Sequence, residues 1–458
     1  MMAMQLAEAA DLLDARCTAA EGSFRGVSTD TRGLEPGALF FALHGPRFDG
    51  HDFVENARER GAAAAAVSRN CETALPLLRV ADTRLALGRL AMHWRCRFDL
   101  PVVAITGSNG KTTVRMMTAA ILSRCGQVLA TRGNLNNDIG LPLTLARLSA
   151  DDDYAVLEMG ANHAGEIAYL TGIARPAVAV VTNAGPAHLE GFRSLEGVAR
   201  AKGEVFTGLA PEGLAVINAE DAFAPLWRQQ AGHCRVVDFG LDDTAAVHAV
   251  WEGDAGGSAI RMVTPQGVLE LRLPLPGRHN VMNALAATAA ALGAGAGLDA
   301  VRAGLESLTP VTGRYHTRHL PGGITVIDDS YNANPGSLQA ALEVLALSGA
   351  ETWLVLGDMG ELGAGTVELH REAGRHARKL GITRLYALGA LAREAAAGFG
   401  GPGGAFDGLE ELLAALRSDL SGPLQILVKG SRSMRMERVV AELAAFLEDS
   451  SVPQGGRN

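Results

Sequence analysis

Short apolar runs alternate with longer helical patterns along most of the chain from residue 100 onward. The runs that we interpret as strands are 102–106, 154–158, 178–182, 214–218 and 235–239. Each is followed by polar loop residues or by a helical pattern, which is typical of parallel strands buried on both faces. This part of the chain therefore predicts a parallel sheet flanked by helices.

Residues 248–275 have a different pattern, because apolar and polar positions alternate there around two turn signals. Those signals are the glycine-rich stretch 253–257 and the Pro-Gln-Gly at 265–267. Such alternation predicts antiparallel strands, which we place at an edge of the same domain. Residues 281–308 are predicted to be helical, and the domain is predicted to end near Pro310.

A third unit begins with residues 323–329, an apolar run that ends in two carboxylates. A helix is predicted from Pro335 through Leu347, and further strands are predicted at 352–356, 384–387 and 425–428. This alternation indicates a second, smaller doubly wound domain. The polar tail 449–458 is expected to be frayed.

The N-terminal part, to about residue 97, mixes short strands and helices. Residues 37–43 predict a buried strand before a Gly-Pro turn, and residues 52–60 predict a helix. Two alanine-rich stretches, 61–67 and 284–298, are predicted to be helices packed in a core.

Composition and charge narrow the class of protein. The 458 residues are 48% hydrophobic, which is enough for substantial cores and about three domains. The net charge of −9 argues against a general nucleic-acid binder, so local basic groups must meet any anionic ligand. No secretory signal and no membrane-spanning apolar run is recognisable. The five cysteines (17, 71, 96, 125 and 234) lack the paired spacing of a disulfide framework or zinc site. We expect a cytoplasmic protein with neither a nucleic-acid nor a membrane partner.

The most informative stretch follows the strand 102–106 and reads Gly107-Ser108-Asn109-Gly110-Lys111-Thr112-Thr113. Glycines let several backbone N–H groups face one anion, and the following helix adds the positive end of its dipole. Lys111 would reach the outer phosphates of a nucleotide, and Thr112 would ligate its magnesium ion. The loop departs from G-x-x-x-x-G-K-[ST], because Ile105 stands at the position of the first glycine. An ordinary strand-to-helix turn is the alternative, but the order of strand, loop, lysine, hydroxyls and helix favours a triphosphate site.

The predicted fold class is therefore α/β with three domains. A small mixed α/β domain covers residues 1–98, a central P-loop parallel-sheet ATPase-like domain covers 99–309, and a doubly wound Rossmann-like domain covers 310–458.

Further candidate residues follow other strands. Glu158 ends an apolar strand at the carboxyl edge of the sheet, beside the phosphate loop, where a carboxylate suits magnesium; a structural role is the alternative. His188 follows the next strand near the same edge. Lys202 would by default be a solvated helix lysine. The cluster Ser28-Thr29-Asp30-Thr31-Arg32 suits a phosphate or a uracil edge, or is simply a capped loop.

The phosphate loop, Glu158, the segment that contains His188, and Lys202 together resemble the Mur ligase family of peptidoglycan synthesis. They occur in the family's order, and two further segments carry the resemblance: Gly277-Arg278-His279-Asn280-Val281-Met282-Asn283-Ala284 and Asp328-Asp329-Ser330-Tyr331-Asn332-Ala333-Asn334-Pro335. The resemblance spans nearly the whole chain. Within the family, segments 28–32, 185–192 and 428–432 are most similar to members that add D-alanyl-D-alanine to UDP-N-acetylmuramoyl-tripeptide.

The resemblance implies an ATP-dependent amide ligase with the catalytic residues Lys111, Lys202, His188 and Arg314. ATP would lie on Gly107 to Thr113, with adenine at Asn280 and Asn283, ribose at Asp329 and the γ-phosphate at Arg314. Thr112 and Glu158 would hold magnesium. His188 and a carbamylated Lys202 would serve a second metal position, so two ions are expected.

Substrate contacts are also implied by the resemblance. Ser28, Asp30 and Arg32 would face the uridine diphosphate, and Asn134, Asn136 and Asn137 the muramoyl-peptide. Lys429, Ser431 and Arg432 would help to capture the dipeptide, and Asn332 and Asn334 complete the predicted substrate-binding set. A loop rich in Asx turns is the alternative for residues 134–137.

Alternatives remain at this point. Related ligases, either the enzyme that adds the third amino acid or a folylpolyglutamate synthase, would share the phosphate loop and the carbamylated lysine. A nucleotide-dependent switch would hydrolyse a triphosphate without joining substrates. Ligands on separate domains predict a site that is complete only when the domains close, and a monomer is expected.

Overall fold

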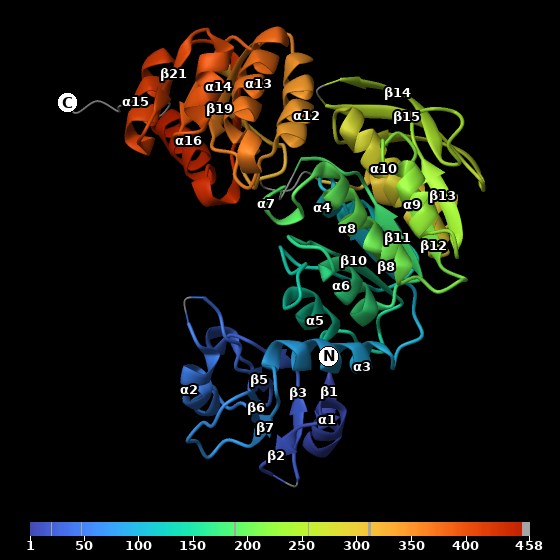
Figure 1. Cartoon of the computed structure of the whole chain (residues 1–458). Coiled ribbons are helices and arrows are strands. Elements are labelled where there is room, and N and C mark those ends of the chain that lie inside the picture. The colour runs from blue at the N-terminus through green and yellow to red at the C-terminus, as the bar shows by residue number, and fades with distance from the viewer. Residues whose placement is uncertain (20, 47, 187–188, 255, 310–312, 451–458) are drawn as a thin grey trace, which may run out of the picture.

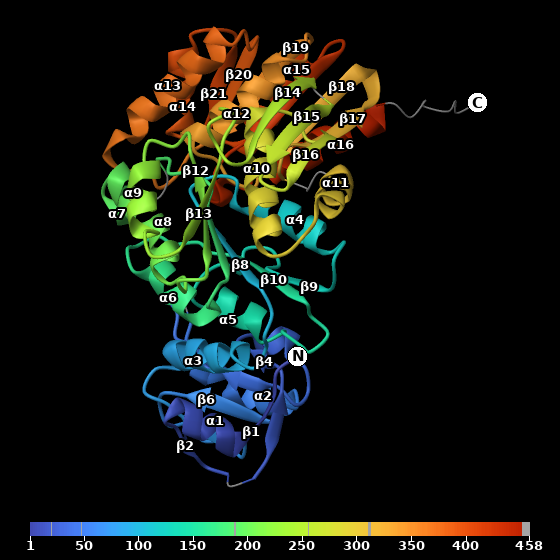
Figure 2. The same ribbon diagram turned by 90° about the vertical axis from the view of Figure 1, so that its right-hand side faces the viewer.

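The computed structural model describes residues 1–450 except 20, 47, 187–188, 255 and 310–312, and it places three α/β units along the chain (Figure 1). The N-terminal unit lies at one end, the central unit in the middle and the C-terminal unit at the other end (Figures 1 and 2). The predicted three-domain α/β class is confirmed, and the boundaries 1–98, 99–309 and 310–458 stay a proposal. No helix among the described residues is both long and apolar enough to span a bilayer.

The N-terminal unit is built on a five-stranded sheet and a two-stranded ribbon. The sheet has the order β2-β7-β6-β5-β4, with parallel pairs from β4 to β7 and an antiparallel edge at β2. The strands are β1 (Ala3–Gln5), β2 (Arg16–Cys17), β3 (Ser23–Arg25), β4 (Val27–Ser28), β5 (Leu39–Phe41), β6 (Ala64–Val67) and β7 (Leu77–Arg79), and the helices are α1 (Leu6–Leu13), α2 (Val54–Glu59) and α3 (Thr83–Arg95).

The helix predicted for residues 61–67 is wrong, because Ala64–Val67 form β6 in the middle of this sheet. All four residues are buried, with Ala64 and Ala66 in one core and Ala65 and Val67 in another. Burial on both faces removes the alternation that marks a strand, so helix propensity alone misled the prediction.

The central unit carries a six-stranded parallel sheet of order β13-β12-β11-β8-β10-β9. Its strands are β8 (Val102–Thr106), β9 (Val128–Ala130), β10 (Tyr154–Glu158), β11 (Val178–Val181), β12 (Leu214–Asn218) and β13 (Arg235–Phe239), and its helices are α4 (Lys111–Leu122), α5 (Gly140–Leu145), α6 (Glu166–Ala174), α7 (Leu189–Phe192), α8 (Leu195–Thr207), α9 (Ala224–Gln230), α10 (Arg278–Gly293) and α11 (Leu298–Glu306). The five predicted parallel strands are confirmed.

The position of β8 in this sheet determines where the site forms. Glu158 pairs with Ile105, and Val181 pairs with Thr106, so the ends of β10 and β11 lie on either side of the end of β8. Loops that follow neighbouring parallel strands emerge at one edge, which is where open α/β sheets bind ligands.

The strands after β13 form a sheet of their own. β14 (His248–Asp254), β15 (Gly257–Thr264) and β16 (Gly267–Leu273) are antiparallel, as predicted, and they pack over α10 in the hydrophobic core on that side of the parallel sheet. The helical stretch predicted for 281–308 is two helices, because Gly295 at φ +99° turns the chain between α10 and α11.

The C-terminal unit has a sheet of order β17-β18-β22-β19-β20-β21, parallel except for the antiparallel edge strand β17. Its strands are β17 (His316–Leu320), β18 (Ile324–Asp329), β19 (Glu351–Gly357), β20 (Arg384–Leu388), β21 (Gly403–Phe406) and β22 (Leu424–Lys429), and its helices are α12 (Pro335–Ala346), α13 (Thr366–Lys379), α14 (Ala392–Phe399), α15 (Leu409–Asp419) and α16 (Glu437–Ser450). The predicted strands and the helix at 335–347 are confirmed, and residues 451–458 of the tail predicted to fray lie outside the described residues.

Candidate active site

The phosphate loop is shaped by two glycines that no other residue could replace without strain. Gly107 has φ +141°, and a Cβ there would lie 1.9 Å from Oγ1 of Thr182. Gly110 has φ +81° and precedes the first residue of α4, and its Cβ would lie 2.4 Å from Oδ1 of Asn283. The loop is therefore packed tightly between the end of β11 and the start of α10.

Hydrogen bonds from the end of β11 fix the middle of the loop. The backbone N–H of Asn109 donates to Oδ1 of Asn183 at 2.9 Å, and the Thr182 hydroxyl donates to the Asn109 carbonyl at 2.6 Å. The Ser108 hydroxyl exchanges hydrogen bonds with the backbone of Gly185. A loop fixed in this way is preorganised for a ligand.

Lys111 turns its ammonium back into the loop. Its Nζ donates to the carbonyl oxygens of Gly107 at 2.7 Å and Ser108 at 3.2 Å. Burial lowers the pKa of Lys111, while the nearby Glu158 acts to raise it. A partly buried cation at the start of a helix favours the binding of an anion.

Glu158 is buried, with 3% of its surface exposed, and its two carboxylate oxygens differ. Oε1 accepts a hydrogen bond from Asn136 at 2.8 Å. Oε2 has no hydrogen-bond partner among the described residues, and the nearest charge is Nε of Arg115 at 3.4 Å. A buried carboxylate oxygen without a hydrogen bond fits a hard cation, because such cations prefer oxygen ligands.

The described residues contain no cluster of three His, Cys, Asp or Glu side chains that could hold a metal ion alone. Mg²⁺ commonly takes one or two carboxylates and completes its coordination with substrate phosphates and water. Glu158 and the Thr112 hydroxyl beside the phosphate loop fit that kind of site, and the chemistry of the donors agrees with the predicted ion.

Lys202, on α8, is buried with 2% of its surface exposed, so the alternative of a solvated lysine is excluded. Its Nζ lies 3.5 Å from the Ala161 carbonyl oxygen and 5.3 Å from the centre of the Phe192 ring. Burial, assisted by the charge of Lys111, lowers the pKa of Lys202 to about 7. An appreciable fraction of this amine is therefore neutral, and so nucleophilic, near neutral pH.

His188, the other predicted ligand near this lysine, lies outside the described residues. The adjacent helix α7 is held by the C-terminal unit, because the Leu189 N–H donates to the carbonyl oxygen of Glu361 at 3.1 Å. Glu361 belongs to the loop after β19. That loop is braced by Asp358, whose Oδ1 accepts hydrogen bonds from the N–H groups of Leu391 and Ala392 at the start of α14.

Asn280 and Asn283 lie on the first turns of α10 and are both buried. The Asn280 amide donates to the Pro276 carbonyl at 2.7 Å, while Asn283 faces Gly110 of the phosphate loop. Both residues therefore line the wall of the cavity beside the loop, and the adenine contacts predicted for them stay a prediction.

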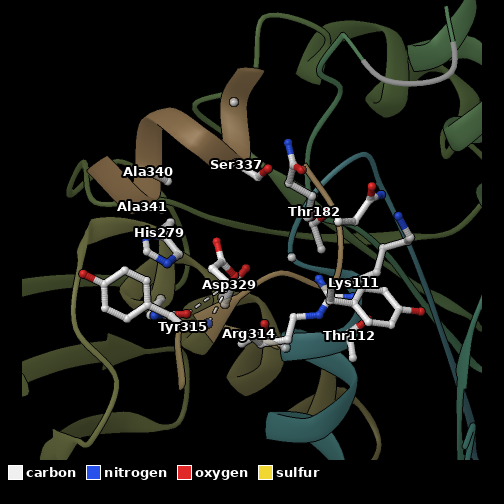
Figure 3. A pocket seen from close by; sticks show the side chains of 18 of the residues that line it. Lys111, Thr112, Thr182, His279, Arg314, Tyr315, Asp329, Ser337, Ala340 and Ala341 are labelled. Carbon is white, nitrogen blue, oxygen red and sulfur yellow. Dashed lines mark hydrogen bonds between the residues drawn. The ribbon is translucent and has the colours of Figure 1, made fainter. Parts of the chain in front are cut away.

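The C-terminal unit supplies the opposite wall of the site (Figure 3). Nη2 of Arg314 donates to Oγ1 of Thr112 at 3.1 Å, and its guanidinium stacks 4.3 Å from the centre of the Tyr331 ring. Figure 3 shows Arg314 extending towards Lys111 and Thr112, with Asp329 on the side of Tyr315 and His279. The cation predicted to meet the γ-phosphate thus reaches the phosphate loop from another domain.

Asp329 and Lys429 act as one unit, because β18 and β22 place them at paired positions in the sheet. Nζ of Lys429 lies 2.5 Å from Oδ2 of Asp329 and also donates to the Asn332 carbonyl at 2.9 Å. Oδ1 accepts from the Tyr315 N–H at 3.1 Å. Lys429 is 2% exposed, so the structure places it behind Asp329, where it orients that carboxylate.

Asn334 joins the two units directly. Its side chain caps α12 by accepting from the Ser337 N–H at 2.9 Å, and its Nδ2 donates to Oδ1 of Asn109 at 2.7 Å. The start of α12 is therefore anchored to the phosphate loop.

These walls enclose a cavity of about 1220 Å³, large enough for a nucleotide and part of a second substrate. Most of the predicted residues line it: Ser108 to Thr113, the asparagines 134, 136, 137, 280, 283, 332 and 334, and Glu158, Lys202, Arg314, Asp329 and Lys429. Sequence reasoning assigned no role to Thr182, His279, Tyr315 or Tyr331, which also line it. His279 and Tyr331 stand inside the segments that carried the family resemblance, whereas Thr182 and Tyr315 carried no signal.

Ser28, Asp30 and Arg32 do not line the cavity. Arg32 and Asp30 pair at 2.6 Å, and the Arg32 hydrogen bond lowers the pKa of Asp30 to about 2. Ser431 and Arg432 also stand outside the cavity: the Ser431 hydroxyl accepts from the Gly360 N–H at 2.6 Å, and Arg432 pairs with Glu437 at 3.2 Å.

The fold and the site define a P-loop nucleotide-binding α/β protein whose phosphate loop faces a cation and a carboxylate from a second nucleotide-binding-like domain. Three family models match in chain order: "Mur ligase family, catalytic domain" at residues 23–95, "Mur ligase middle domain" at 105–291, and "Mur ligase, glutamate ligase domain" at 313–432. The chain belongs to the Mur ligase family.

Full-length relatives narrow the comparison. The chain is 46% identical over 451 residues to the UDP-N-acetylmuramoyl-tripeptide–D-alanyl-D-alanine ligase of Escherichia coli, covering 97% of this chain and 99% of the relative. It is 36% identical to the ligase of the same name from Bacillus subtilis, covering 91% and 93%.

Solved structures agree with these relatives. MurF from Acinetobacter baumannii matches with a TM-score of 0.92 at 36% identity, covering 97% of this chain and 99% of that one. MurF from Thermotoga maritima in complex with ADP matches with a TM-score of 0.83 at 28% identity, covering 93% and 99%. A folylpolyglutamate synthase of Mycobacterium tuberculosis, at 19% identity, covering 79% and 95%, and a TM-score of 0.64, shares the fold alone.

Proposed function

We propose that this chain joins D-alanyl-D-alanine to the terminal carboxyl of UDP-N-acetylmuramoyl-tripeptide, with release of ADP and phosphate. The observation that carries the proposal is the 46% identity to a ligase of that name over 99% of its length. The geometry supports it, because Lys111 and Arg314 approach the same end of the cavity from two domains. We place the reaction in the cytoplasm and expect a monomer.

The chemistry explains the residues in the cavity. A carboxylate is a poor acylating agent, so its oxygen first attacks the γ-phosphorus of ATP, and ADP leaves. The resulting acyl phosphate is attacked by the amino group of the dipeptide, which loses a proton, and the tetrahedral intermediate expels inorganic phosphate. Phosphoryl transfer needs charge neutralisation and alignment more than a protein nucleophile.

The chain's own cations perform the neutralisation in this proposal. Lys111 and the N–H groups of Gly110 to Thr113 hold the β- and γ-phosphates, and Arg314 offsets charge on the transferring group. Asn280 and Asn283 face adenine, and Asp329, held by Lys429, accepts from the ribose hydroxyls.

Thr112 and Glu158 would hold a magnesium ion, and His188 and a carbamylated Lys202 would serve a second metal position. Bound magnesium would neutralise phosphate charge and fix phosphate orientation. The neutral amine of Lys202 would attack carbon dioxide, forming an N–C bond and losing a proton, so that a buried cation becomes an anionic carbamate. The lowered pKa of Lys202 supports this modification.

The predicted substrate contacts are divided among the three domains. Asn134 and Asn137 would contact the muramoyl-peptide beside Glu158. Asn136, whose amide already donates a hydrogen bond to Glu158, would orient that peptide. Ser28, Asp30 and Arg32 would hold the uridine diphosphate at a distance from the reacting atoms. Asn332, Asn334, Ser431 and Arg432, on the C-terminal side, would receive the dipeptide.

Two domains contribute to one site, so we propose that it is complete only when they close. Closure would keep water from the acyl phosphate. Small-angle scattering of the free and fully liganded protein should give different profiles, and identical profiles would count heavily against closure.

The test of the function is the release of ADP and phosphate with defined acceptors. Release should require both UDP-tripeptide and D-alanyl-D-alanine, and D-alanine or another single amino acid should not replace the dipeptide. Turnover with a single amino acid and a UDP-dipeptide would assign the related ligase that adds the third residue. Hydrolysis that needs no acceptor would indicate a nucleotide switch.

A further inference from the structure

Glu158 has a counter-cation supplied by the protein itself. Arg115 lies one turn after Lys111 on α4, and only 13% of its side chain is exposed. Its Nε lies 3.4 Å from Oε2 of Glu158, and its Nη1 donates to the carbonyl oxygen of Thr131. The Thr131 hydroxyl accepts from the Glu158 N–H at 3.0 Å. Arg115 is therefore anchored to the strand segment that also holds the backbone of Glu158.

The ion pair is attractive but poorly aligned. Neither Nε of Arg115 nor Oε2 of Glu158 has a hydrogen-bond partner among the described residues, although both atoms are buried. Oε1 of the same carboxylate, by contrast, accepts a well-formed hydrogen bond from Asn136 at 2.8 Å. One oxygen is thus fixed by a short hydrogen bond, while the other is held only by the longer contact with Arg115 and is available to a better partner.

We propose that Arg115 is a positioning residue that neutralises Glu158 until a nucleotide brings a metal ion. Free Mg²⁺ at Glu158 would meet three cations, Arg115, Lys111 and Arg314, with no phosphate to offset them. Nucleotide phosphates supply both negative charge and further oxygen ligands. Arg115 thereby makes Glu158 selective for the metal–nucleotide complex over the free ion. This inference rests on one part of the proposed function, namely that the nucleotide binds together with magnesium.

Thermal unfolding of the full chain tests this selectivity without measuring turnover. The wild-type protein should gain stability from ADP with MgCl₂, but not from MgCl₂ alone relative to NaCl of equal ionic strength. Arg115→Gln should unfold at a lower temperature without ligand and should be stabilised by MgCl₂ alone. The titration should correspond to at least about tenfold tighter binding of the free ion than in the wild type.

Two variants control for a general loss of stability. Arg384 pairs with Asp419 at 2.9 Å in the C-terminal unit, so Arg384→Gln removes another, more exposed, arginine–carboxylate ion pair outside the cavity. It should lower the unfolding temperature without any gain from MgCl₂. Combining Arg115→Gln with Glu158→Gln should abolish the gain, which assigns it to this carboxylate.

A lowered unfolding temperature of Arg115→Gln with no response to MgCl₂ would overturn the proposal and leave Arg115 a purely structural role. If that variant does not fold, the proposal is tested on the wild-type protein. Its binding of Mn²⁺ is measured by electron paramagnetic resonance. Mn²⁺ should bind at least about tenfold more tightly with ADP than without it, and equal affinities would overturn the proposal. Both binding assays need only the protein, ADP and the metal ion. A protein that does not ligate the dipeptide would therefore contradict the proposed function without changing the outcome of these assays.

Discussion

The phosphate loop and the N-terminal segment 28–32 are both short polar loops, yet the structure stabilises them in opposite ways. The phosphate loop is fixed from outside: Asn183, Arg314 and Asn334 reach it from other segments. Segment 28–32 is stabilised mainly from within, because Ser28, Asp30 and Arg32 hydrogen-bond to one another two residues apart, and the one side-chain contact described from another segment is Arg60 donating to the Arg32 carbonyl at 3.1 Å. The Arg32 side chain is 87% exposed.

The difference corresponds to the roles that we propose for the two loops. Groups that align reacting atoms must be held to within fractions of an ångström, which requires contacts from several elements. A handle for a distant part of the substrate needs only affinity. Substitutions in the two loops should therefore have effects of different size and kind.

Lys111→Ala should have the largest effect. It removes the cation at the centre of the loop, and turnover should fall by at least about 10³-fold because transition-state charge is left unneutralised. Steady-state release of ADP measures this. Wild-type turnover in the variant would move the nucleotide site elsewhere.

Lys202→Ala should come next, since it removes the carbamate that we propose for the second metal position. Activity should fall by about 10²-fold or more, and high concentrations of acetate should restore part of it by supplying a carboxylate. Sodium chloride at the same ionic strength is the control. Full activity without acetate would contradict the carbamate.

Asn334→Ser should have a moderate effect that isolates the contact between domains. Serine still caps α12 but is too short to donate to Asn109, so kcat/KM for ATP should fall by about 2- to 10-fold with little change in stability. Asn334→Ala removes the cap as well and should also lower the unfolding temperature. An unchanged kcat/KM in the serine variant would mean that the amide contact does not align the loop.

Arg32→Gln should have the smallest effect, confined to one substrate. KM for the UDP-tripeptide should rise by less than about tenfold, while kcat and KM for ATP stay unchanged, because the segment stands outside the cavity. Kinetics at saturating ATP separate these quantities. A loss in kcat as large as that of Lys202→Ala would show that segment 28–32 also affects the chemical step, and would contradict the difference that we propose between the two loops.

Local sequence patterns predicted the elements well where burial leaves a periodic signal. The strands before Gly107 and Glu158 are each a short apolar run that ends in functional residues, and both form as predicted. The strand at 64–67 was missed, because alanines buried on both faces have no alternation. The edge strand β21, Gly403–Phe406, was missed because it contains two glycines.

The parts of the site that depend on docking between domains could not be predicted. Asn334 was predicted to bind substrate, and its contact with Asn109 joins residues 225 positions apart. Tyr331 and Arg115 gain their significance from neighbours that no spacing in the sequence reveals. Motif order pointed to most of the residues that line the cavity, whereas the partners of these residues are determined by the tertiary structure.

In the reaction that we propose, ATP activates the terminal carboxylate of the UDP-tripeptide as an acyl phosphate. The most direct measurement uses UDP-tripeptide with ¹⁸O in that carboxylate, together with ATP and D-alanyl-D-alanine, followed by mass spectrometry of the phosphate and the peptide product. One ¹⁸O atom should be transferred to inorganic phosphate for each pentapeptide formed. Pentapeptide formed with phosphate that carries no ¹⁸O would contradict it.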